Sequence, residues 1–141
     1  MTEALAQYQN LAQSLQVDAI ALVPGPNFTR ALGHSFMSHE RPFVLLISAN
    51  GAPAALVPNL ELGSWELVGF DGAVFDWRDQ EGYDQAFAAL ARHMPCRRIA
   101  VEGQVMRVFV HHALKQAMPD LEIIDAEREI SGLRMIKTAE D

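Results

Sequence analysis

Polar side chains that could bind a small ligand gather in the segment 27–42. It contains Arg30, His34, His39 and Arg41, and Arg41 comes just before a long apolar run. A guanidinium presents a planar fork that fits a carboxylate, and an imidazole can donate or accept a hydrogen bond. Binding residues concentrate on loops that a rigid scaffold holds in place. Residue chemistry alone, however, favours an exposed connection whose charges keep the chain soluble.

The other reactive residues do not form a catalytic or metal-binding pattern. His111 and His112 are adjacent, and adjacent helical residues diverge by about 100°, so the pair cannot face one ion. Cys96 is the only cysteine, which excludes a disulfide framework and a thiolate zinc site. Acidic residues near the end of the chain are better explained as a solvated face; these are Glu122, Asp125, Glu127 and Glu129. We therefore expect no catalytic residue, metal site or cofactor site in this chain.

Composition narrows the class of protein. The 141 residues are 50% hydrophobic and 21% charged, which is typical of one soluble domain. A net charge of −7 argues against a nucleic-acid partner, because phosphate binding needs clustered Lys and Arg. Neither a signal peptide nor an apolar run of membrane-spanning length is recognisable, so a cytoplasmic location with no membrane partner is expected.

The elements that must position these residues alternate between two periodicities. Apolar residues recur at helical spacing around 3–16, 27–32, 60–67, 83–94 and 106–117. Short apolar runs predict strands at 18–23, 42–49, 54–57, 72–75, 98–101 and 121–125. Asn50-Gly51 predicts a hairpin with a type I′ turn. The expected fold is a three-layer α/β domain, with a mixed sheet of about five or six strands and helices on both faces.

Five motifs, in order along the chain, resemble one family. The chain has Pro26-Asn27-Phe28 followed by Leu32-Gly33, although Ala31 stands where an aromatic residue is usual. The remaining four are Glu40-Arg41-Pro42, Asn50-Gly51 followed by Leu56-Val57-Pro58-x-x-Glu61, Ile99-Ala100-Val101-Glu102-Gly103 and Leu133-Arg134-x-x-Lys137-x-x-Glu140. Together they are similar to the N-terminal domain of the creatinase/prolidase/aminopeptidase P family, the pita-bread metallopeptidases.

This resemblance implies a fold, a domain division and a parent activity. The fold would be the ribonuclease H-like α/β domain over residues 1–125, with 126–141 beginning the linker to a C-terminal catalytic domain. The parent would be a dimeric hydrolase similar to Xaa-Pro dipeptidases (prolidases) or aminopeptidase P. Two divalent metal ions, Mn, Co or Zn, would be held by the catalytic domain alone. The N-terminal domain would be non-catalytic and would contribute to dimerisation and substrate access.

The resemblance also implies a substrate-binding role for two residues. In creatinase-like members an aromatic residue and an arginine before this strand reach into the neighbouring subunit's catalytic pocket. Arg41 matches the arginine, and His39 stands where the aromatic residue would be. Two other functions stay open. The chain could be a stand-alone α/β module that binds a small acidic ligand, or the same domain from a creatinase-like amidinohydrolase or a lyase.

Overall fold

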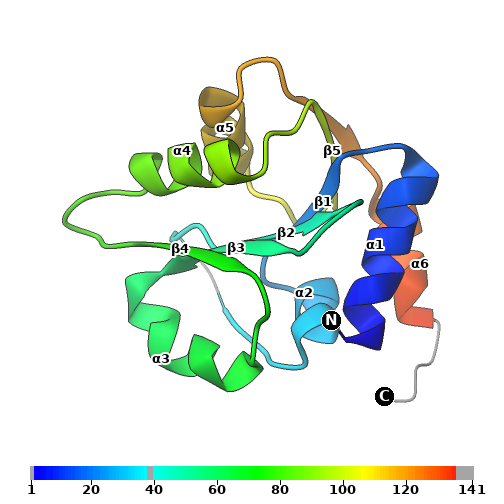
Figure 1. The fold of residues 1–141 in the computed structure, drawn as a ribbon, viewed down its shortest axis with the longest axis horizontal. Coiled ribbons are helices and arrows are strands. Elements are labelled where there is room, and N and C mark those ends of the chain that lie inside the picture. Colours follow the sequence, from blue (N-terminus) through cyan, green and yellow to red (C-terminus); the bar gives the residue numbers. More distant parts are fainter. Residues whose placement is uncertain (1, 38–39, 136–141) are drawn as a thin grey trace.

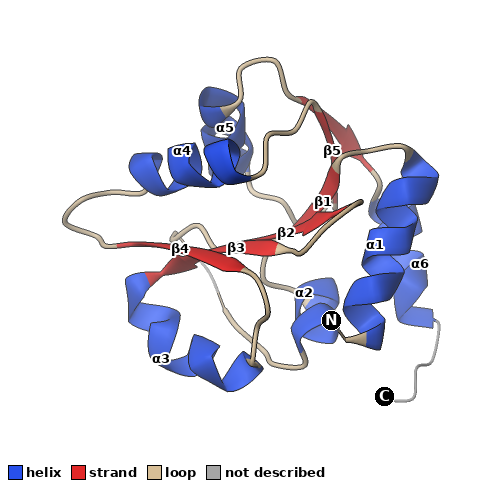
Figure 2. Cartoon of the chain, viewed as in Figure 1, coloured by secondary structure: helices blue, strands red, loops and turns tan. Residues whose placement is uncertain are grey.

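A six-stranded mixed sheet forms the centre of the molecule (Figures 1 and 2). The computed structural model describes residues 2–37 and 40–135. The strands are β1 (Ala19–Leu22), β2 (Val44–Ser48), β3 (Ala54–Pro58), β4 (Ala73–Trp77), β5 (Arg98–Val101) and β6 (Glu122–Asp125). The α-helices are α1 (Glu3–Leu15), α2 (Pro26–Leu32), α3 (Leu62–Trp65), α4 (Asp84–His93), α5 (Val108–Ala117) and α6 (Glu127–Gly132). Three 3₁₀ turns are η1 (Asn59–Glu61), η2 (Glu66–Val68) and η3 (Leu133–Met135).

The strand order is β4-β3-β2-β1-β5-β6, which confirms the expected mixed sheet. β2 runs antiparallel to both of its neighbours, β1 and β3, whereas the β3–β4, β1–β5 and β5–β6 pairs are parallel. The predicted hairpin is present, with Val44 opposite Leu56 and Leu46 opposite Ala54. The start of β2 therefore lies at the same edge of the sheet as the ends of β3 and β4.

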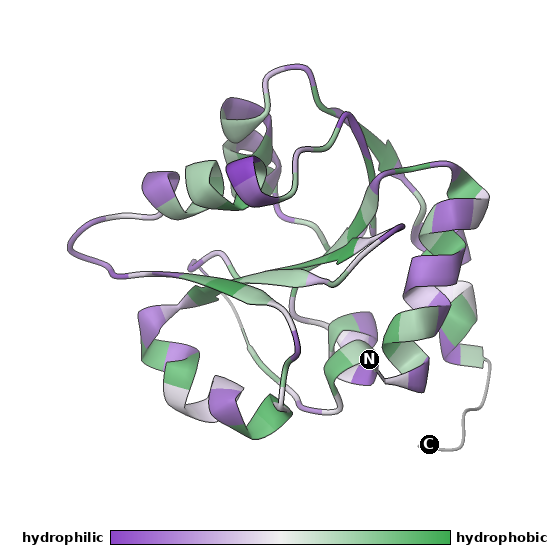
Figure 3. Ribbon diagram, in the orientation of Figure 1, coloured by the Kyte–Doolittle hydropathy of each residue, from purple (hydrophilic) through white to green (hydrophobic). Residues whose placement is uncertain are grey.

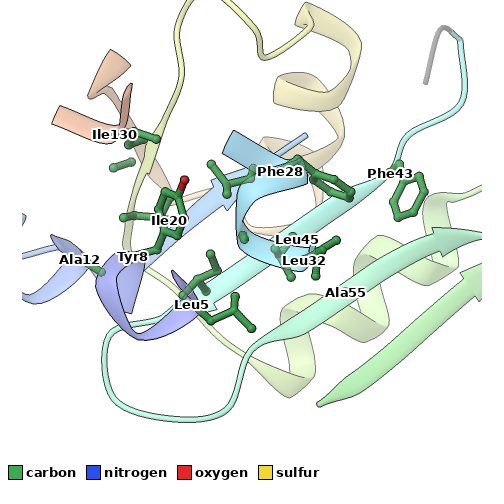
Figure 4. Close-up of a cluster of buried hydrophobic side chains, with 14 of the residues drawn as sticks. Leu5, Tyr8, Ala12, Ile20, Phe28, Leu32, Phe43, Leu45, Ala55 and Ile130 are labelled. Atoms are coloured by element: carbon green, nitrogen blue, oxygen red, sulfur yellow. The ribbon is translucent and has the colours of Figure 1, made fainter. Parts of the chain in front are cut away.

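Successive strand residues point to opposite faces, and each face has its own helical layer. Ile20 and Leu45 pack with α1, α2, α3 and α6 on one side (Figure 4). Ala21 and Leu46 pack with α4 and α5 on the other side. Apolar colour runs along the central strands in Figure 3, because both of their faces are covered. This confirms the three-layer arrangement.

Local signals explain where two of the helices begin and end. The hydroxyl of Thr2 accepts a hydrogen bond from the backbone N–H of Leu5 at 3.1 Å, which caps the start of α1. Gln16 ends α1 in the left-handed region with φ 59°. Gly33 ends α2 with φ 76°, where a residue without a Cβ is favoured. The cap at Thr2 and the end of α2 at Gly33 follow the sequence prediction closely.

The predicted type I′ turn at Asn50-Gly51 is wrong, although the hairpin itself forms. Among the described residues with positive φ, neither Asn50 nor Gly51 is present, and a type I′ turn requires positive φ at both. The connection spans 49–53, which is longer than a two-residue turn. Two α1 side chains hold it instead. Gln9 Nε2 donates to the carbonyls of Ser48 (3.1 Å) and Gly51 (2.9 Å), and Gln13 Nε2 donates to that of Ala49 (2.7 Å).

The segment expected to begin the linker starts as a packed helix. Ala126 and Ile130 are buried in the same hydrophobic cluster as Tyr8 on α1. The junction motif continues through Lys137 and Glu140, which lie outside the described residues. The division of the chain at residue 126 stays a prediction. Within the described ranges, no helix is both long and apolar enough to cross a bilayer.

Candidate functional site

Arg41 precedes β2, whose start lies at the same end of the sheet as the end of β4, with β3 between the two strands. Its Nε and Nη2 atoms donate to Oδ1 (3.0 Å) and Oδ2 (2.6 Å) of Asp79, which follows β4. The indole Nε1–H of Trp77 donates to the carbonyl oxygen of Pro42 at 3.1 Å. One neutral hydrogen bond and one ion pair thus join the two segments. A planar guanidinium held by both carboxylate oxygens has a fixed orientation.

The ion pair is open to solvent. The side chains of Arg41 and Asp79 are 41% and 51% exposed. The hydrogen bond from Arg41 holds the pKa of the Asp79 carboxyl below its usual value, and Asp79 raises the pKa of Arg41. Pairs this exposed contribute little to stability, because water screens the charges. The main effect of the Arg41–Asp79 pair is to hold the Arg41 guanidinium in a fixed orientation at the surface.

Two hollows are lined by this pair. One, of about 160 Å³, is lined by Leu60 and Trp77 together with the ion pair. The other, of about 360 Å³, is more open and includes Glu40 and Tyr83. Leu60 is 72% exposed and supplies apolar surface to the first hollow. The site therefore combines a guanidinium with apolar surface, a combination that fits a small ligand carrying a carboxylate.

His39, the second predicted site residue, lies outside the described residues. The other histidines are separated from one another, apart from the adjacent pair on α5. His34 is half-buried, and the exposed His93 stacks on Phe75 with ring centres 5.4 Å apart. His112 is exposed and His111 half-buried on α5. The described part of the chain contains no group of three or more His, Cys, Asp or Glu side chains that could hold a metal ion. The resemblance places the two metal ions in the catalytic domain, not among these residues.

The acidic residues near β6 have structural partners. Glu122 pairs with Arg98 at 3.0 Å. Asp125 Oδ1 accepts the backbone N–H groups of Gly103 (3.0 Å) and Glu127 (2.9 Å). Gly103 must lack a side chain, since a Cβ there would lie 2.4 Å from the Asp125 carboxyl carbon. The cluster therefore organises the β5 and β6 ends instead of gathering around an ion.

Sequence reasoning missed a buried polar network on the α1 side of the sheet. The hydroxyl of Tyr8 donates to Asn27 Oδ1, and Asn27 Nδ2 donates to Glu102 Oε2, both at 2.8 Å. Asn27 is 0% and Glu102 3% exposed. Two of the quoted motifs contain these residues: Asn27 is at the start of a short helix, and Glu102 directly follows a buried strand. A buried polar residue in either position needs a hydrogen-bond partner. The network explains why those motifs carry an Asn and a Glu.

A larger hollow lies away from Arg41. It has a volume of about 390 Å³ between the start of α1, the end of α2 and the β2–β3 connection. Its lining is mainly apolar, with Leu5, Leu32 and Phe70, and Asp71 lies at its rim. It contains no arrangement of reactive groups, so chemistry favours the smaller hollows beside Arg41.

Comparison with known proteins places this geometry in context. The creatinase/prolidase N-terminal domain family matches residues 5–136. An uncharacterized hydrolase/peptidase, y4tL of Sinorhizobium fredii, is 25% identical over 137 residues, covering 88% of this chain and 35% of that protein. The chain thus spans about a third of the length of this curated relative.

Solved structures share the fold over nearly the whole chain. A proline dipeptidase structure from Streptococcus pneumoniae superposes with a TM-score of 0.85 at 23% identity, covering 97% of this chain and 100% of that one. A recombinant prolidase from Thermococcus sibiricus gives a TM-score of 0.81 at 25% identity, covering 98% of this chain and 38% of that one. The six-stranded α/β architecture is therefore that of these domains.

Proposed function

The chain belongs to the creatinase/prolidase N-terminal domain family, and we propose that it is the non-catalytic domain of a metal-dependent, Xaa-Pro dipeptidase-like hydrolase. In this proposal it supports a homodimer and controls access of small peptides to the partner's active site. Relatives that are solved as proline dipeptidases and prolidases favour a peptidase over an amidinohydrolase or a lyase. The two divalent ions, Mn, Co or Zn, belong in this proposal to the C-terminal domain.

The observation that carries the proposal is the arginine fork beside exposed apolar surface. Dipeptides end in a carboxylate, and an oriented guanidinium is the side chain best suited to bind one. Asp79 already takes the Nε–Nη2 edge and fixes the plane of the guanidinium, so a substrate carboxylate would share the guanidinium with it. Leu60 and Trp77 line the adjoining hollow. His39, two residues earlier, is proposed as a second contact on its position in the sequence. The Arg41 side chain is 41% exposed, so it is accessible to another subunit.

The test is steady-state kinetics on the protein that carries this domain together with its catalytic domain. Arg41→Ala is expected to raise KM for an Xaa-Pro dipeptide about tenfold or more, the size expected for a lost charge-assisted contact, with the fold and metal content unchanged. Arg41→Lys keeps the charge but loses the planar guanidinium, so its KM should be intermediate between those of wild type and Arg41→Ala. His39→Ala is measured in the same way.

Asp79→Asn is the matched control. It removes the local ion pair but leaves the guanidinium in place, so its KM should rise much less than that of Arg41→Ala. If Arg41 merely braces the loop, the two variants will have the same KM. A dipeptide amide provides a second check, because it lacks the carboxylate. Wild type should bind it weakly, and Arg41→Ala should weaken it no further. An equal loss on both substrates would rule out carboxylate recognition by Arg41.

A further inference from the structure

Glu102 is an acidic side chain that the proposed function does not use. It follows β5 directly and is 3% exposed. Its Oε2 accepts the hydrogen bond from Asn27, whereas its Oε1 is buried without a hydrogen-bond partner in the part of the chain that the structure describes. A buried carboxylate with one oxygen unsatisfied is costly when ionised and much less so when protonated.

A short series of hydrogen bonds connects Glu102 to α6. The same Asn27 Nδ2 that donates to Glu102 lies 3.4 Å from Ser131 Oγ on α6. Ser131 Oγ donates to Glu127 Oε2 at 2.8 Å, and Glu127 Oε1 accepts the backbone N–H of Gln104 at 3.0 Å. Asn27 thus divides its two amide hydrogens between Glu102 and the helix. A change in how strongly Glu102 attracts the Asn27 amide therefore changes the hydrogen bond between Asn27 and Ser131 of α6.

Charged and titratable groups of α1, α2, α6 and η3 surround the Glu102 network. Burial raises the pKa of Glu102, and the hydrogen bond from Asn27 lowers it. Glu127 of α6 raises the same pKa through like charge, and Arg134 of η3 lowers it. From α1, the Tyr8 hydroxyl reaches the same Asn27, and from α2 the Arg30 guanidinium lies over the Tyr8 ring at 5.6 Å. The strongest like-charge neighbour is therefore on the helix that the network holds.

We propose that Glu102 is a proton-operated latch for α6. With Glu102 neutral, Asn27 shares its hydrogens between the two sides, and no buried charge opposes Glu127. With Glu102 ionised, the carboxylate draws the Asn27 amide toward itself and repels Glu127, and α6 is released more readily. The latch does not depend on the proposed peptidase function. If that function is right, α6 precedes the catalytic domain, and the latch adjusts the attachment of one domain to the other.

Amide hydrogen exchange in the 141-residue chain tests this directly. The Ile130 amide of α6 donates to the Ala126 carbonyl at 2.9 Å, and the Phe87 amide at the start of α4 donates to that of Tyr83 at 3.1 Å, so they serve as probe and reference. After correction for intrinsic exchange, protection of Ile130 should fall as the pH rises through the raised pKa of Glu102. Each unit by which the pKa of Glu102 is raised corresponds to about a tenfold loss of Ile130 protection. Protection of Phe87 should change less. The midpoint at Ile130 should match the titration of the Glu102 side-chain carboxyl carbon, followed by NMR in the same samples.

Two variants separate the latch from a general loosening. Glu102→Gln cannot ionise, so Ile130 protection should no longer depend on pH. Ser131→Ala cuts the link from Asn27 to the helix, and it should lower Ile130 protection at pH 5 while leaving the Glu102 titration in place. The latch is overturned if Glu102 titrates in the ordinary Glu range, if the midpoints disagree, or if Glu102→Gln keeps the pH response. If Glu102→Gln does not fold, the comparison of midpoints in wild type still decides.

Discussion

Replacing Asn27 with alanine is expected to be among the most damaging polar substitutions in the domain. Asn27 is fully buried and joins Tyr8 on α1 to Glu102 after β5. Its removal leaves the Tyr8 hydroxyl and the Glu102 carboxyl without their 2.8 Å partner. An abandoned buried polar group costs about 1–3 kcal/mol and more when charged, so we expect the free energy of unfolding to fall by about 3–5 kcal/mol.

The loss should also depend on pH, with a sign that the structure fixes. Burial raises the pKa of Glu102 in the folded state. The contribution of neutral Glu102 to stability is therefore fully present below its pKa in the unfolded chain, and it is lost as the pH rises through its pKa in the folded protein. The Asn27 hydrogen bond opposes that shift. Without it the ionised form is penalised further, and Asn27→Ala should be more destabilising at pH 8 than at pH 5.

Urea unfolding at both pH values, followed by fluorescence of the buried Trp65 and Trp77, measures this loss. Asn59→Ala is the matched control, because Asn59 donates one 3.1 Å hydrogen bond to Asp76 at the exposed edge of the sheet. It should cost less than about 1 kcal/mol. If Asn27→Ala costs no more than this control, or costs the same at both pH values, the argument from the buried network is refuted.

Two further predictions concern a thiol and a loop. Burial raises the pKa of the Cys96 thiol to about 11, so a disulfide reagent at pH 8 should react far more slowly with the native protein than with the urea-unfolded chain; equal rates would contradict the burial. Gln13→Ala should cost about 1–2 kcal/mol in urea unfolding, since the Ala49 carbonyl loses its 2.7 Å donor. Asn10→Ala, on the exposed side of the same helix, should change stability by less than about 0.5 kcal/mol.

The sequence predicted elements whose signals are local. The end of α2 at Gly33 and the start of α1 at Thr2 were predictable, because each residue acts on backbone within a few positions of itself. The β2–β3 connection was misread because its conformation depends on Gln9 and Gln13, which belong to another element and carry no mark of that task. Periodicity also could not give the strand order, since it does not say which apolar strands become neighbours.

The candidate site divides in the same way. Arg41 was recognisable from its position before a strand, but Asp79 was not, because it lies 38 residues further along the chain. Pairing of β3 with β4 brings the two together. Glu102 was within reach of sequence reasoning, since an acidic residue at the end of a buried strand requires a partner. That partner, Asn27, is 75 residues away and could be identified only from the fold.

The position of β1 has a consequence for how the chain folds. Ala19 pairs with Ser48 on one side and with Ile99 on the other, so one edge of β1 can be closed early and the other only late. Contacts between residues far apart in sequence form slowly, because a long loop must first be closed. During synthesis the unpaired backbone N–H and C=O groups of β1 therefore stay open until β5 emerges, which exposes them to wrong partners. A strand that is fully buried in the finished domain is thus a vulnerable one while the chain is being made.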